Sequence, residues 1–131
     1  MFSEVDKTNT MNIFFKMCCK INLIKLLEGF THGIGCCIND IALVFSDDPD
    51  ENNPDQMREY KELENFIGVG FYCNFFPSPL LVTYHEFYSC LKSIVDEYIS
   101  DKDISYKQEA TMYLSKIKER YILTEDDYAN D

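Results

Sequence analysis

The clearest strand pattern in the chain is NFIGVGFYCNFF, residues 65–76. Two sets of side chains alternate along it with a period of two. One set is Ile67, Val69, Phe71, Cys73 and Phe75, and the other is Gly68, Gly70, Tyr72 and Asn74. Because successive side chains of a strand point to opposite faces of a sheet, this alternation predicts a strand with one face on the core. The two glycines predict close approach by another backbone or an aromatic group.

Two further strands flank this stretch in the sequence. After Pro77-Ser78-Pro79, the run Leu80–Val82 predicts a short strand. The earlier run Ile38–Phe45 is rich in branched residues and carries apolar side chains on both of its faces, so we expect one central strand there. Residues 46–56 contain Asp-Asp-Pro and Asn-Asn-Pro, which are typical of an exposed loop.

Helices are predicted at both ends of the chain. Apolar residues recur at helical spacing from Thr10 to about Leu27, which predicts one helix or two short ones; they are Phe14, Met17, Cys18, Ile21 and Ile24. Thr83 and Glu86 match a capping box, so a helix should begin at Tyr84. Ser105 with Gln108 repeats the capping pattern and predicts a last helix.

The order of these elements predicts an α+β fold. We expect a small, mostly antiparallel β-sheet of about three or four strands with helices packed on one face. A length of 131 residues fits a single domain spanning 1–131, with flexible ends at about 1–10 and 124–131.

Charge is the most unusual property of the chain. It has 23 acidic residues against 12 Lys and Arg, for a formal net charge of −11. Residues 47–64, which we call the acidic segment, hold Asp47, Asp48, Asp50, Glu51, Asp55, Glu59, Glu62 and Glu64, against only Arg58 and Lys61. Binding to nucleic-acid phosphates or anionic lipids needs Lys and Arg, so neither ligand is expected. The segment favours a basic protein partner.

The chain offers little for catalysis. We interpret its cysteines as reduced thiols of a cytoplasmic protein, because they lie in or beside apolar runs and lack C-x-x-C spacing; they are Cys18, Cys19, Cys36, Cys37, Cys73 and Cys90. No metal, cofactor or membrane span is expected. One alternative stays open, a small cysteine-dependent hydrolase that uses Cys36 or Cys37 with His32.

The region Asp40–Tyr98 resembles immunity proteins of bacterial contact-dependent growth inhibition systems, specifically the group paired with ribonuclease toxins. The resemblance lies in the loop rich in acids, the strand IGVGFY, the strand LLV and the helix TYHEFYSCLKSIVDEYI, and SKIKERY resembles the last helix of that group. It implies a protein that binds and neutralises the C-terminal nuclease domain of a toxin. It implies no catalytic residues.

The resemblance and the charge together predict a partner-binding site for a basic nuclease toxin domain. Carboxylates would occupy the phosphate-binding region of the toxin, and aromatic side chains would anchor the complex. The predicted site consists of Asp47, Asp48, Asp50, Glu51, Asp55, Glu59, Tyr60, Glu62, Glu64, Phe66 and Tyr72. A third reading is an acidic mimic of nucleic acid that occupies a DNA-binding protein.

Overall fold

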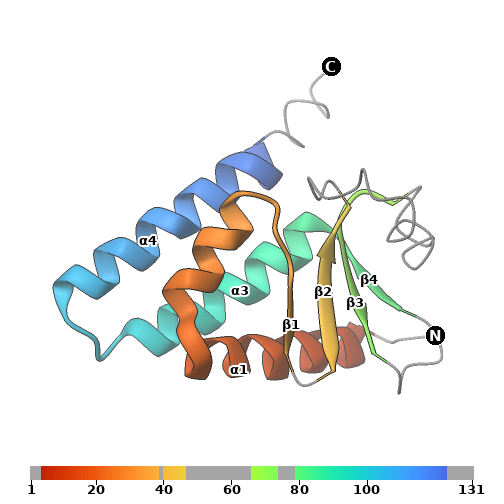
Figure 1. The fold of residues 1–131 in the computed structure, drawn as a ribbon, viewed down its shortest axis with the longest axis horizontal. Coiled ribbons are helices and arrows are strands. Elements are labelled where there is room, and N and C mark those ends of the chain that lie inside the picture. The colour runs from red at the N-terminus through yellow and green to blue at the C-terminus, as the bar shows by residue number, and fades with distance from the viewer. Residues whose placement is uncertain (1–3, 39, 47–65, 74–78, 124–131) are drawn as a thin grey trace.

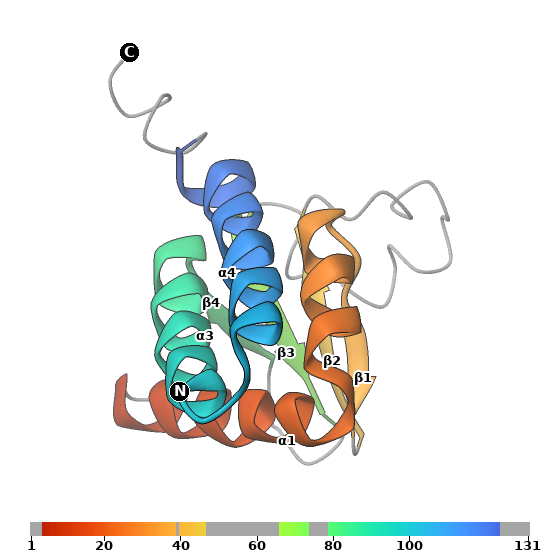
Figure 2. The same cartoon turned by 90° about the vertical axis from the view of Figure 1, so that its left-hand side faces the viewer.

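The computed structural model describes residues 4–38, 40–46, 66–73 and 79–123. In chain order, its elements are α1 (Glu4–Thr31), β1 (Cys36–Ile38), β2 (Ile41–Phe45), β3 (Val69–Tyr72), β4 (Leu80–Val82), α3 (Tyr84–Ile99), α4 (Ile104–Lys118) and the π-helix η3 (Glu119–Leu123). The strands form one side of the molecule and the helices the other (Figure 1). Seen from the helical side, the sheet lies behind the helices (Figure 2).

The four strands form one antiparallel sheet in the order β1-β2-β3-β4. Leu43 pairs with Phe71, and Phe45 pairs with Val69, which in turn pairs with Val82. All five of these side chains are buried, because the alternation along each strand points them toward the helices. The predicted α+β class, with an antiparallel sheet and helices on one face, is confirmed.

Phe87 of α3 lies at the centre of the core. Its ring centroid is 5.7 Å from that of Phe15, 5.8 Å from that of Phe30 and 5.4 Å from that of Phe45, all in edge-to-face geometry. The ring of Tyr121 in η3 is 6.3 Å away. One side chain therefore links α1, β2, α3 and η3 through aromatic contacts that each add to the burial of apolar area.

Helix α1 is longer than predicted and is kinked. It begins at Glu4, so residues 4–10 are helical rather than part of a flexible end. The backbone of Asn22 is non-helical, with φ −166° and ψ 83°, and its Oδ1 accepts a hydrogen bond from the Lys25 amide at 3.3 Å. Asn22 thus caps a second helical segment. Ile21, the residue before the kink, belongs to the predicted apolar stripe of this helix. Its side chain is nevertheless 64% exposed.

The run predicted as a single strand at 38–45 is a hairpin of β1 and β2. The chain reverses at Asp40, whose φ of 67° lies in the left-handed region that aspartate tolerates better than most residues. Only one face of β2 is fully covered, because Ala42 and Val44 are half-buried. The expectation of one strand was therefore wrong, although β2 does lie inside the sheet.

The strand predicted at 65–76 is also shorter in the structure. β3 covers only Val69–Tyr72, and Ile67 is 71% exposed instead of facing the core. The alternation ends at Gly68, where φ is 158° and where an added Cβ would overlap the backbone oxygen of Val82. Residues 65 and 74–78 lie outside the described residues.

One of the two predicted helix starts is confirmed. The Thr83 hydroxyl accepts from the Glu86 amide at 3.1 Å, and the Glu86 carboxylate accepts from the Thr83 amide at 2.9 Å, which completes the capping box. The prediction for α4 was wrong, because its cap is Asp103, whose Oδ1 accepts from the Tyr106 amide at 2.8 Å. A carboxylate is as good a cap as the hydroxyl of Ser105.

Candidate partner-binding site

Most of the predicted partner-binding residues lie outside the described residues. These are Asp47, Asp48, Asp50, Glu51, Asp55, Glu59, Tyr60, Glu62 and Glu64. The structure does describe Phe66 and Tyr72, and both are half-buried. Phe66 precedes β3 and Tyr72 ends it, so they stand at opposite ends of that strand. The structure also describes the residues from which the acidic segment departs and to which it returns.

Ser46 and Gly68 hold these two points of the chain together, and we call the pair the base of the acidic segment. The Ser46 amide donates to the Gly68 carbonyl at 2.9 Å, and the Gly68 amide donates to the Ser46 hydroxyl at 3.1 Å. This reciprocal pairing continues the β2–β3 ladder by one step, beyond the pair Phe45 and Val69. Ser46 and Gly68 are therefore held next to each other at the end of the β2–β3 ladder.

Tyr84 connects the base to the core. Its hydroxyl is 2.9 Å from the Ser46 hydroxyl, and its ring stacks on that of Tyr121 with centroids 4.5 Å apart. Tyr121 in turn stacks on Phe45, with centroids 5.0 Å apart and ring planes inclined by 4°. The Tyr121 hydroxyl donates to the carbonyl of Phe30 at 2.9 Å. Four elements, β2, α1, α3 and η3, thus converge on the base.

Ile67 directly precedes Gly68 of the base. It belongs to the apolar set of the 65–76 pattern, together with Val69 and Phe71. In the structure its side chain is 71% exposed. The signal that could have shown this is Gly68, since a glycine inside a strand pattern often marks the end of regular pairing.

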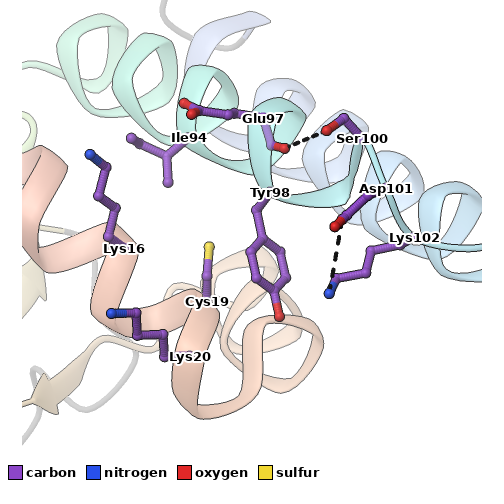
Figure 3. A pocket seen from close by; sticks show the side chains of 9 residues that line it. All are labelled: Lys16, Cys19, Lys20, Ile94, Glu97, Tyr98, Ser100, Asp101 and Lys102. Carbon is purple, nitrogen blue, oxygen red and sulfur yellow. Dashed lines mark hydrogen bonds and ion pairs between the residues drawn. The ribbon is translucent and has the colours of Figure 1, made fainter.

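A separate cleft of about 420 Å³ lies between α1, α3 and the connection to α4 (Figure 3). It is lined by Lys16, Cys19, Lys20, Ile94, Glu97, Tyr98, Ser100, Asp101 and Lys102. Lys16 and Lys20 extend from α1 away from the Tyr98 ring, whereas Lys102 lies 4.6 Å from the centroid of that ring and 4.0 Å from the Asp101 carboxylate. The charges around the cleft are mixed and do not converge on one point.

The sequence of residues 7–114 matches the family model described as CDI immunity protein, where CDI stands for contact-dependent growth inhibition. The chain belongs to this family. The match covers most of α1, the whole sheet, α3 and most of α4. No curated protein and no solved structure matches the chain. The family assignment confirms the resemblance to CDI immunity proteins and gives this chain the role of an immunity protein.

The cysteine and histidine residues of the hydrolase alternative do not form a catalytic pair within the described residues. His32 is exposed, and no hydrogen bond joins it to Cys36 or Cys37 in the described part of the chain. Cys36 instead pairs with Cys18 of α1, and this hydrogen bond lowers the pKa of the Cys36 thiol and, with burial, raises that of Cys18. The cleft thiol Cys19 has a pKa raised to about 11 by burial and lies beside no histidine of the cleft lining.

Among the residues that the structure describes, no group of three or more His, Cys, Asp or Glu side chains could hold a metal ion. None of the helices in the described part of the chain combines the length and apolar character needed to cross a bilayer.

The buried thiols should make folding stability fall at alkaline pH. Burial raises the pKa of Cys19 and of Cys90 from 9.0 to about 11. The unfolded chain therefore releases these protons near pH 9 while the folded protein retains them, so the stabilisation is complete below pH 9 and is lost toward pH 11. We expect a loss of about 1–2 kcal/mol per thiol. Urea unfolding at several alkaline pH values, with a reductant present, measures it.

The matched control is Cys19→Ala, which removes one of the two thiols. Its unfolding free energy should fall less steeply with pH than that of the unsubstituted protein, whatever its stability at neutral pH. Equal slopes for the two proteins would show that Cys19 keeps an ordinary pKa.

Proposed function

We propose that this CDI immunity protein binds the nuclease domain of its cognate toxin, a ribonuclease, through the acidic segment, and blocks it without forming or breaking a covalent bond. Membership of the CDI immunity family supports a role in toxin neutralisation. The observation that carries the finer proposal is the density of carboxylates in residues 47–64, which is opposed only by Arg58 and Lys61.

The chemistry of the target explains why acids would be used. A ribonuclease must hold the phosphates of its substrate, which requires Lys, Arg or His around the cleft. A cluster of carboxylates fits such a cleft by charge and steers the two proteins together over long distances. The same charge opposes binding of this chain to nucleic acid or to anionic lipid. We place the complex in the cytoplasm, where thiols such as these stay reduced.

Charge alone does not account for tight binding. A nanomolar complex corresponds to about −12 kcal/mol, which requires packed aromatic and apolar contacts in addition to steering. Tyr60, Phe66 and Tyr72 are the aromatic anchors of the proposal. The geometry of the base supports it, because the contacts among Ser46, Gly68 and Tyr84 hold described residues on either side of the acidic segment against the core. Less ordering is then needed when the partner docks.

The test mixes the purified protein with the toxin domain encoded beside it and with RNA, and then measures RNA cleavage. A variant with Asp47, Asp48, Asp50 and Glu51 all changed to Lys should lose protection. The matched control reverses four exposed acids elsewhere, Glu28, Glu97, Asp101 and Glu109, and so changes the net charge by the same amount. The control should protect fully. Full protection by a folded variant with the acidic segment reversed would remove the segment from the mechanism.

A further inference from the structure

Two cysteines from different elements, Cys18 and Cys36, meet between α1 and the sheet. Cys36 begins β1 and pairs with Leu43 of β2. Side chains of directly paired residues lie on the same face of a sheet, and Leu43 is buried on the face that the helices cover. Cys36 therefore points toward the helices, where α1 packs against β1. Cys18 of α1 belongs to the core against which Cys36 packs, and the two thiols share a hydrogen bond.

The cysteines next to this pair in the sequence point elsewhere. Cys37 lies on the opposite face of the strand and is exposed. Cys19 lines the cleft together with Tyr98 (Figure 3). Each member of the pair thus has an adjacent cysteine in a different environment, and these two neighbours serve as matched controls.

The two thiols of the pair differ in access and in acidity. Cys18 is 1% exposed, whereas Cys36 is half-buried, so a small molecule reaches Cys36 first. The hydrogen bond between them lowers the pKa of the Cys36 thiol and raises that of Cys18, and burial adds to the rise at Cys18. The thiolate is the form that oxidants attack. An accessible thiolate beside a second thiol is the arrangement of oxidation-sensitive cysteines.

We propose that Cys36 and Cys18 are a peroxide-reactive pair that closes reversibly into a disulfide between β1 and α1. The Cys36 sulfur attacks one oxygen of hydrogen peroxide and the O–O bond breaks. The other oxygen leaves as hydroxide and becomes water with the proton that Cys36 released. The Cys18 sulfur then attacks the sulfenic acid on Cys36, the S–O bond breaks, and the hydroxyl leaves as a second water with the Cys18 proton. The two sulfurs lose two electrons, which reduce the peroxide.

The disulfide would tie a helix to the edge strand of the sheet. It closes a loop from residue 18 to residue 36, which contains the kink at Asn22 and the turn at Gly33. A crosslink of this kind removes freedom from the unfolded chain and so stabilises the fold. A dithiol reductant reopens it by thiol–disulfide exchange. The inference is independent of the toxin and of the acidic segment.

The experiment treats the purified full-length protein with an equimolar amount of hydrogen peroxide, blocks the remaining thiols, and maps its tryptic peptides by mass spectrometry without reductant. Cleavage after Lys and Arg leaves Cys18 and Cys19 in the peptide 17–20, and Cys36 and Cys37 in the peptide 26–58. We expect a crosslink between these two peptides within one chain, which dithiothreitol removes. The oxidised protein should also unfold at a higher urea concentration than the reduced protein.

Variants assign the bond, because each of the two peptides carries two cysteines. The double variant Cys19→Ala with Cys37→Ser should keep the crosslink and the shift in urea. Cys18→Ala and Cys36→Ser should each lose both. Cys18→Ala should also leave a sulfenic acid on Cys36 that dimedone labels, whereas Cys36→Ser should leave none on Cys18.

Three results would overturn the proposal. The first is the absence of the crosslink in the oxidised unsubstituted protein, or its appearance only when the protein is unfolded in urea. The second is a crosslink that survives in Cys36→Ser or disappears in a folded Cys19→Ala, Cys37→Ser double variant. The third is an oxidised protein that carries the crosslink and unfolds at an unchanged or lower urea concentration.

Discussion

Replacing Phe87 by alanine should lower the free energy of unfolding by about 3–5 kcal/mol. The side chain is fully buried and its ring meets those of Phe15, Phe30, Phe45 and Tyr121. Removing it leaves a cavity among rings that belong to three other elements, α1, β2 and η3, and these cannot all move inward together. Such a loss is a large part of the total stability of a domain this size.

Urea unfolding followed by circular dichroism measures this effect. The control is Tyr88→Ala on the same helix, because Tyr88 is only partly buried and packs at the edge of the core. We expect Tyr88→Ala to be clearly less destabilising than Phe87→Ala. Comparable losses from the two substitutions would show that the aromatic cluster around Phe87 is not the centre of the core.

The second large effect is expected at Gly68. A Cβ at this position would overlap the carbonyl oxygen of Val82 and press on the ring of Phe66, and the φ of 158° is one that side chains rarely adopt. Gly68→Ala should therefore force the β3–β4 pairing or the base apart. We expect a loss of about 1–3 kcal/mol, as is usual for overpacking against a rigid neighbour.

Gly29→Ala is the matched control for this prediction. A Cβ at Gly29 would make only ordinary contacts, at 3.6 Å and 3.9 Å, with Ile34. Because Gly29 lies inside α1, alanine there should be neutral or stabilise by up to about 1 kcal/mol. Chemical denaturation of both variants decides the matter, and equal stability of the two would mean that Gly68 has room for a side chain.

Much of the fold could be predicted from local sequence because the signals are local. The alternation around Val69 and Phe71 and the pair Thr83 and Glu86 each act within a few residues, and the structure confirms both. The turn at Asp40 was missed because it lacks glycine and proline, although an Asn-Asp pair can also support a tight turn. The kink at Asn22 divides α1 into two segments, as in the predicted alternative of two short helices, but the sequence did not indicate its position.

The candidate site was likewise only partly predictable from the sequence. The acidic segment is visible in the sequence because its residues are neighbours along the chain. The base is not, because Ser46 meets Tyr84 across a separation of 38 residues, and Tyr121 reaches Phe30 across 91. No pattern in the sequence links such pairs. The exposure of Ile67 likewise depends on where the ladder between β2 and β3 ends, which is a property of the pairing and not of either strand alone.

Stopped-flow association of this CDI immunity protein with its cognate toxin domain, at low and at high salt, tests the proposed mechanism. We expect a tight complex whose association rate exceeds the usual ~10⁵–10⁷ M⁻¹s⁻¹ at low salt, falls as salt rises, and drops when Asp47, Asp48, Asp50 and Glu51 are changed to Lys. An association rate that neither salt nor this substitution alters would show that the acidic segment does not steer the toxin.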